Sequence, residues 1–237
     1  MTSCHAGPQR VRLIRALTVL LTVSGAGVLL WSSPAMARIN CQAAPGPGVN
    51  LRGCYLVDAS FAGANLTGAR LSHANLTGAN LSGANLGNAK LTGANLDGAN
   101  LANTTLSHAN LDFATLNGAT LNGANLMKAH LVRAQLNGVK LIGARLIEAR
   151  FLNAMLPNAT VTNASLEATN LNGANLSGAN LSNTTLFKAR LAGADLANAN
   201  LSNAILVHAS LRGANVSGVT WTGAACPDTS IAGPQGC

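Results

Sequence analysis

Residues 78–86 read Gly-Ala-Asn-Leu-Ser-Gly-Ala-Asn-Leu, and this five-residue pattern decides the fold of the chain. From Leu51 to Trp221 every fifth residue is a large apolar side chain, through 35 successive units without an insertion or deletion. Thirty of these residues are Leu, and the residue two positions earlier is Ala in 28 units. Asn stands between them in 14 units, and Gly or Asn most often follows two positions after the Leu. The chain is therefore one long repeat.

A period of five fits neither an α-helix nor a flat strand. Leucines spaced by five would spread around the whole surface of a helix with 3.6 residues per turn, and a strand alternates with a period of two. Asn and Gly also disfavour helix. A coil in which each unit turns one corner would point every Leu and Ala inward. With four units per turn, successive turns would stack about 4.8 Å apart, and the stacked Asn side chains would hydrogen-bond from turn to turn.

The Ala-Asn-Leu-x-x units resemble the pentapeptide-repeat family over residues 49 to 224. The resemblance implies an all-β fold, a right-handed quadrilateral parallel β-helix in a single domain. A composition with 9% charged and 3% aromatic residues is unusual for a globular domain, but a solenoid tolerates it because each repeat packs only on its neighbours. A family fold of this kind implies an architecture and leaves the activity open.

The first 37 residues have the composition of a secretory signal peptide. An apolar run from 16 to 31 follows three arginines, and the small-x-small pattern of residues 35–37 is typical of a cleavage site. The run is slightly shorter than the roughly 20 residues that cross a bilayer, and an uncleaved membrane anchor is the alternative. We expect a bacterial protein that is exported by the general secretory route and begins at Arg38. It would be secreted or held at the cell surface without spanning the membrane.

The expected segments are a signal peptide at 1–37, an N-terminal cap segment at 38–50, the repeat coil at 51–224 and a C-terminal tail at 225–237. Four cysteines follow residue 37, two near the start of the coil and two near its end. An even set in an exported chain indicates disulfides, and of three pairings we expect Cys41–Cys54 and Cys226–Cys237. A metal site is the weaker alternative, because neither pair has C-x-x-C spacing and no His accompanies them.

The tail from Trp221 to Cys237 resembles those of exported actinobacterial members of the family. Both ends of a solenoid need covering, since they expose unpaired backbone. We expect a disulfide-tied cap at each end, with Trp221 lying over the last layer of the coil.

The basic residues are predicted to gather on one side of the coil. The chain has a formal charge of +8, and removing residues 1–37 leaves 12 basic and 7 acidic residues, a charge of about +5. If four units make one turn, every fourth unit returns to the same wall, and one of four walls collects 7 of the 11 basic residues after Arg38. The candidate anion-binding stripe consists of Arg70, Lys90, His130, Arg133, Arg150, Arg190 and Arg212, with Arg52 on the same wall and Lys128, Lys188, His108 and His208 along its corner.

The stripe has two interpretations. It could bind an acidic partner, or it could be a solvated face that keeps an otherwise apolar rod soluble. Three acidic residues, Asp58, Asp97 and Asp195, would fall on the next wall. Phe113 is the one aromatic residue near the stripe, so base stacking with single-stranded nucleic acid is disfavoured.

The sequence contains no catalytic constellation. No His lies at ligand or triad spacing from a Cys or carboxylate, the acidic residues are scattered, and the Ser and Thr residues have no neighbouring base. We therefore expect no enzyme, no cofactor, no metal and no small-molecule substrate. The favoured function is an exported structural or interaction module for a protein or an acidic cell-envelope polymer. Self-association is left open.

Two other functions are disfavoured. Some pentapeptide-repeat proteins resemble DNA and protect topoisomerase from poisons, which needs an acidic surface in the cytoplasm; the basic charge and the export signal argue against that role. Ice binding would need a ladder of Thr residues on one wall, and residues such as Thr105, Thr115 and Thr160 do not share a column at a spacing of 20.

Overall fold

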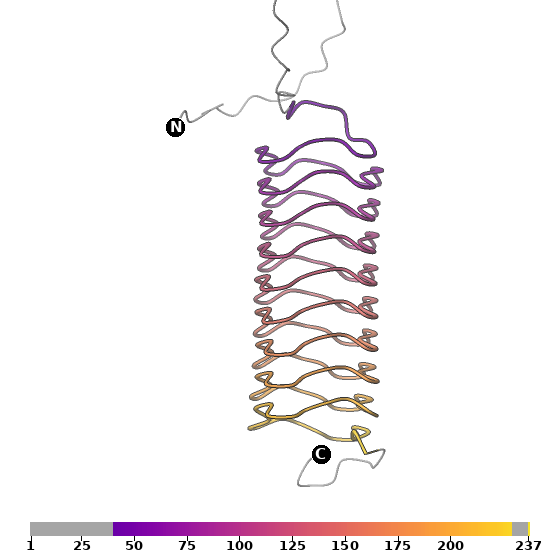
Figure 1. Ribbon diagram of the computed structural model, residues 1–237, viewed down its shortest axis with the longest axis vertical. Helices are drawn as coiled ribbons and strands as arrows, with labels where there is room; N and C mark the ends of the chain where they lie inside the picture. Colours follow the sequence, from indigo (N-terminus) through magenta and orange to yellow (C-terminus); the bar gives the residue numbers. More distant parts are fainter. Residues whose placement is uncertain (1–39, 229–236) are drawn as a thin grey trace, which may run out of the picture. The chain divides into compact units, whose positions relative to one another are not determined.

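The computed structural model describes residues 40–228 and Cys237. The chain divides into two units, Met1–Ala37 and Arg38–Cys237, and every described residue belongs to the second. The expected signal peptide therefore lies outside the described residues. Figure 1 shows the second unit as a stack of similar backbone loops wound about one axis.

Each loop of the coil consists of four repeat units. Parallel bridges join the residue before each Leu to the residue 20 positions later, from Asn50↔Arg70 to Ile205↔Ala225. Four such bridges recur in every loop, which makes four bridged columns and about nine turns. The prediction that residues 20 apart stack on each other is confirmed.

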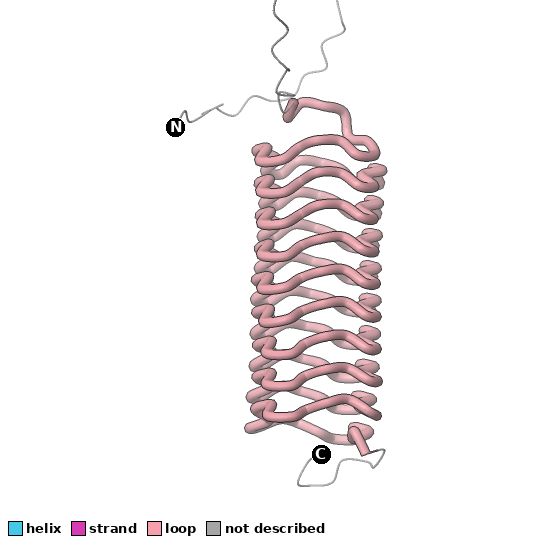
Figure 2. Tube along the Cα trace, viewed as in Figure 1, coloured by secondary structure: helices cyan, strands magenta, loops and turns pink. Residues whose placement is uncertain are grey.

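The walls of the coil consist of bridged residues without regular strands. Residues 40–228 contain no helix and no strand longer than one bridged residue, and Figure 2 draws the coil as turns and loops throughout. Nor does this part of the chain hold a helix capable of spanning a membrane. The fold is a repeat solenoid whose turns are joined by isolated bridges. Strands are missing because each unit spends four of its five residues on a turn, which leaves one residue to pair.

The turn explains the recurrence of Gly and Asn. We number each unit from its Leu, so that Leu is position 1, Ala position 4 and the bridged residue position 5. The position-4 N–H donates to the position-1 carbonyl, as from Ala79 to Leu76 at 3.0 Å, and position 3 has a φ between 54° and 71° in every unit. A positive φ at the third of four residues defines a type II turn, which favours Gly or Asn there. The sequence showed this preference, but its backbone conformation was not predicted.

Asn at position 5 completes the backbone hydrogen bonding. The position-1 and position-3 amides donate to the following turn and the position-5 amide to the preceding one, for example Leu81 N to Asn100 O at 2.7 Å. The position-2 amide has no such partner, and the side-chain oxygen of each of the 14 Asn residues at position 5 accepts from it. The expected turn-to-turn Asn ladder is therefore mostly a local cap, because buried backbone donors require acceptors.

The interior consists of alternating Leu and Ala layers. Position-1 residues from Leu51 to Leu206 and nearly all position-4 residues are buried. Three Thr residues replace Ala inside the coil, and each hydroxyl donates to a backbone carbonyl at 2.6–2.8 Å: Thr104 to Leu101, Thr169 to Leu146 and Thr184 to Leu181. These polar groups are satisfied, so they do not interrupt the apolar core.

Disulfides tie both ends of the coil, with the expected partners. Cys41 bonds Cys54 at 2.06 Å and Cys226 bonds Cys237 at 2.17 Å. Cys54 occupies an Ala position and is buried, so this bond runs from inside the coil to the N-terminal segment. Trp221 is half-buried and packs against the core, and Val216 in the last layer stays 40% exposed.

Candidate functional site

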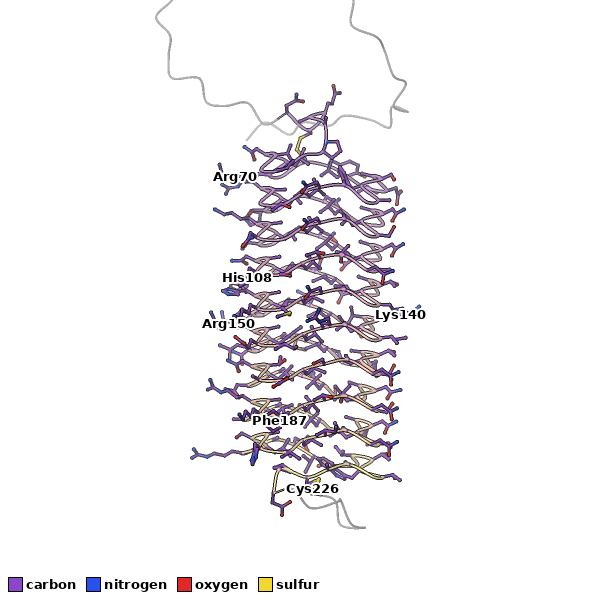
Figure 3. All side chains as sticks on the ribbon, turned by 90° about the vertical axis from the view of Figure 1, so that its right-hand side faces the viewer. Arg70, His108, Lys140, Arg150, Phe187 and Cys226 are labelled. Carbon is purple, nitrogen blue, oxygen red and sulfur yellow. A yellow bond between two sulfur atoms is a disulfide. The ribbon has the colours of Figure 1, made fainter. Side chains whose placement is uncertain are left out.

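Five residues of the predicted stripe form one column. Bridges connect Arg70↔Lys90, His130↔Arg150 and Asn170↔Arg190 in a continuous series from Asn50 to Ser210, which contains no acidic residue. We call this column the basic wall. Its four Arg and Lys side chains are exposed and His130 is half-buried. Figure 3 shows Arg70 and Arg150 projecting from one side of the coil and Lys140 from the opposite side.

Where a basic residue occupies position 5, the hydrogen bond that an Asn side chain makes to the position-2 amide is lost. Arg and Lys have no acceptor atom, so at Arg70, Lys90 and Arg150 position 5 cannot bind the position-2 amide as Asn110 binds Asp112 N at 2.9 Å. A hydrogen bond of this kind contributes about 0.5–1.5 kcal/mol. At two other layers a side chain of the preceding turn replaces the cap: Asp112 Oδ1 accepts from Val132 N at 2.8 Å and Asn172 Oδ1 from Ala192 N at 3.0 Å.

The remaining stripe residues lie at the corner that follows the basic wall. Arg212 occupies position 2 of its turn and Arg133 position 3, and both are exposed. Arg133 helps to line a hollow of about 490 Å³ on the next wall, whose other lining residues are Asn117, Gln135, Asn137, Asn153, Met155 and Pro157. The structure thus brings five of the seven predicted residues together and places Arg133 beside a neighbouring surface.

Two side-chain contacts involve the corner that precedes the basic wall. From the wall on its other side, Arg145 places Nη2 3.4 Å from Met127 Sδ. Lys128 Nζ lies 3.6 Å from a Glu148 carboxylate oxygen, with both side chains about half exposed. Such an exposed pair contributes little to stability.

An aromatic cluster lies on the same corner, nearer the C-terminal end of the coil. Lys188 Nζ sits 4.9 Å from the centre of the Phe187 ring, and the His208 ring meets Phe187 edge-on at 5.6 Å. We define the corner ridge as positions 2 and 3 of five successive layers, residues 127–128, 147–148, 167–168, 187–188 and 207–208. The sequence predicts Lys128, Lys188 and His208 at this corner but does not single out Met127, Ile147 or Phe187.

The corners differ in which residues adopt the left-handed backbone. Apart from Gly, Asn and Asp, nine position-3 residues have positive φ, and all nine lie on the two corners that flank the basic wall. The left-handed conformation costs an ordinary L-residue about 1–2 kcal/mol. The other two corners hold Gly and Asn, with Asp58 as an exception. The nine residues are His73, His108, Phe113, Lys128, Arg133, Glu148, Ala168, Lys188 and His208.

The described part of the chain has no cluster of three His, Cys, Asp or Glu residues arranged to hold a metal ion. Its surface chemistry consists of the basic wall, the two flanking corners and the shallow hollow beside Arg133. Such features can bind a partner by charge and contact.

Comparison with known proteins identifies similar chains. A family model described as pentapeptide repeats matches in eight copies, and the matched stretches together cover residues 48–223. No curated protein matches the sequence.

Solved structures are also similar. HetL, a pentapeptide repeat protein involved in heterocyst differentiation regulation from the cyanobacterium Nostoc sp., is 32% identical over 78% of this chain and 92% of its own, with a TM-score of 0.30. Trypsin-treated QnrB1, a plasmid-mediated fluoroquinolone resistance protein, is 19% identical over 72% of this chain and 88% of its own, with a TM-score of 0.52. The similarity to QnrB1 supports the coil fold alone.

Proposed function

Because the chain belongs to the pentapeptide-repeat family, we propose that it is an exported, non-enzymatic interaction module whose basic wall binds an acidic protein or polymer of the cell envelope. The observation that carries the proposal is the column from Arg70 to Arg190, where basic residues share one wall in a series of bridged residues that contains no acidic residue. The coil fixes the backbone of each residue and so sets the spacing of these charges.

The charges are close enough to act together. Neighbouring layers lie about 4.8 Å apart and layers two turns apart about 10 Å, while the screening length at physiological salt is about 8 Å. The potential along the wall is therefore a sum over several residues. A solvated face would need charge as well, but it would not need the charges to share one wall at the expense of local caps.

Export has independent support. Residues 1–37 carry the sequence pattern of a secretory signal, and the two disulfides of the remaining chain suit an oxidising compartment. We place cleavage before Arg38. The alternative role, a DNA-like protector of topoisomerase in the cytoplasm, is disfavoured by the same features and by the basic wall.

We also infer that the coil is a right-handed quadrilateral. Four type II turns in each loop favour four sides. Connections between parallel strands of one sheet are right-handed in nearly all proteins, because of the twist of L-peptide backbones. The same steric preference applies to a chain that returns to parallel pairing after every fourth unit.

Titration with fluorescent poly-L-glutamate tests the binding proposal on the mature protein. We expect binding that weakens between 50 and 200 mM salt, and a loss of about tenfold or more when Arg70→Gln, Arg150→Gln and Arg190→Gln are combined. Lys140→Gln, on the opposite wall, is the matched control for Arg150→Gln and should leave affinity unchanged. Equal affinity of the triple variant and the natural protein would refute the role of the wall.

A further inference from the structure

We propose that the corner ridge is a docking site for an amphipathic α-helix of a partner protein, with an apolar stripe on the ridge and acidic residues on both flanks of that stripe. The proposal deepens the function given above and rests on it in one respect, because both require an acidic partner. It adds the kind of secondary structure that the partner presents and the apolar contacts that it makes.

The ridge offers apolar contact in four of its five layers, and Glu167 occupies position 2 of the middle layer. At position 2, Met127, Ile147, Phe187 and Val207 are half-buried, so part of each side chain faces solvent. Ile205, on the adjoining wall, is 44% exposed. On the other corners position 2 holds mainly small or polar residues such as Ser, Thr, Ala and Asn. Partly exposed apolar side chains that gather on one corner mark an interaction surface more often than single ones do.

Position 3 of the ridge also lacks the Gly and Asn that prevail at the other corners. Elsewhere a left-handed Asn lies against a Gly of the next layer, as Asn103 does against Gly123 and Asn198 against Gly218, and a Cβ at either Gly would collide with it. From His108 to His208 no position 3 of the ridge corner is Gly or Asn. The six position-3 residues on these successive layers adopt a backbone conformation that Gly would adopt with less strain. We attribute their presence to the contacts that their side chains make with a partner.

The spacing of the layers suits a helix. An α-helix advances 5.4 Å per turn, and at a crossing angle of about 27° this projects to about 4.8 Å, the distance between layers. Five layers span about 19 Å, the length of roughly 13 helical residues. In an extended strand, side chains on one face repeat every 6.6 to 6.8 Å, which leaves a mismatch of about 2 Å at each layer.

The charges around the ridge define the flanks of the helix. On one side the basic wall presents His130, Arg150 and Arg190, and on the other side Arg145 reaches Met127. Within the ridge Glu148 is paired with Lys128, Lys188 lies over Phe187, and Glu167 stands in the middle layer. The apolar line is therefore bordered by cations on both sides, so its complement is an apolar stripe bordered by carboxylates.

The probe is an 18-residue synthetic helix with Leu at i, i+3, i+4 and i+7 and Glu on both flanks, compared with a scrambled peptide of equal composition. We expect the mature protein to bind the helix at least tenfold more tightly than the scrambled peptide. Combining Met127→Ser, Ile147→Ser and Phe187→Ser should weaken helix binding at least tenfold. Poly-L-glutamate binding should not change, because the wall charges are intact. Ser is common at position 2, so the variant retains the fold.

Substituting Gly at position 3 of the ridge provides a second, independent test. Lys128→Gly, Glu148→Gly and Lys188→Gly together should raise Tm and weaken helix binding, since the backbone relaxes as the contacts disappear. Asn158→Gly and Asn198→Gly, on the diagonally opposite corner, are the control and should leave helix binding unchanged.

The two proposals fail separately. Loss of poly-L-glutamate binding in the Arg triple variant supports the wall, and loss of helix binding in the Ser triple variant supports the ridge. Equal binding of the helix and the scrambled peptide by the natural protein, or full helix binding by the Ser triple variant, would overturn the ridge proposal whatever the wall does.

Discussion

At the scale of the residue, position 3 decides how each corner forms. Its φ of 54° to 71° is a conformation that Gly enters freely, Asn with modest cost and other L-residues with strain. Position 5 decides whether the neighbouring amide is capped, since Asn offers an acceptor and Arg or Lys does not. The basic wall and the ridge are therefore both built from residues that fit the turn less well than the repeat consensus.

Two single substitutions test the cost of the left-handed backbone. Ala168→Gly should stabilise the protein by about 0.5–1 kcal/mol, because Gly relieves steric strain but loses more chain entropy on folding. Gly118→Ala should destabilise it by about 1 kcal/mol, although an added Cβ has no atom within 4 Å, because only the backbone conformation is unfavourable there. Urea unfolding of both variants measures the difference. Shifts of the same sign would contradict this account.

At the scale of the element, the unit is a type II turn plus one bridged residue. A single unit cannot bury its own Leu, so it is stable only between the turns before and after it. The first and last turns lack one neighbour, and each is tied by a disulfide. The N-terminal bond begins at Cys54, an otherwise standard Ala position inside the coil.

Removing the N-terminal disulfide should loosen the first turn. Cys41→Ala combined with Cys54→Ala keeps the usual residue at position 4 and leaves no unpaired thiol. We expect a loss of about 2–4 kcal/mol in unfolding free energy. Hydrogen exchange should accelerate in residues 50–65, while residues near Cys226 keep the rates of the natural protein. Unchanged exchange in the first turn would show that the bond does not secure it.

At the scale of the whole molecule, the four-unit winding converts a one-dimensional sequence into surfaces. Residues that are distant in sequence, such as Arg70, Arg150 and Arg190, share a wall because the bridges place them on one column. Each turn contacts only its neighbours, so surface residues can vary without disturbing the Leu and Ala interior. This separation lets one wall carry charge and one corner carry apolar side chains.

The proposed export predicts the first residue and the mass of the recovered protein. If residues 1–37 are a signal peptide, the protein recovered from the growth medium or the cell surface should begin at Arg38. Its intact mass should be lower than that of the reduced chain by the hydrogens of two disulfides. Mass spectrometry before and after reduction measures both quantities. A recovered chain that still begins at Met1 would favour the membrane-anchor interpretation.

Much of the coil follows from the sequence because its cause is local and repeated. An apolar residue at every fifth position from Leu51 to Trp221 requires a corner in each unit, and two cysteines near each end favour pairing within each end. The column of Arg70, Lys90, Arg150 and Arg190 then follows from four units per turn. The left-handed backbone at position 3 was missed, although the frequency of Gly and Asn there indicated it.

By itself, then, the sequence determined the inward Leu and Ala, because both depend on one unbroken period, and it determined the basic column once four units are taken to make a turn; the bridges between residues 20 apart established that winding. Only the tertiary structure decided that Asn caps its own turn, that Arg133 lines a hollow on the next wall, and that Met127, Glu148, Phe187 and His208 form one ridge. Those outcomes depend on how side chains from successive layers meet once the turns are stacked. The spacing along the chain does not contain that information.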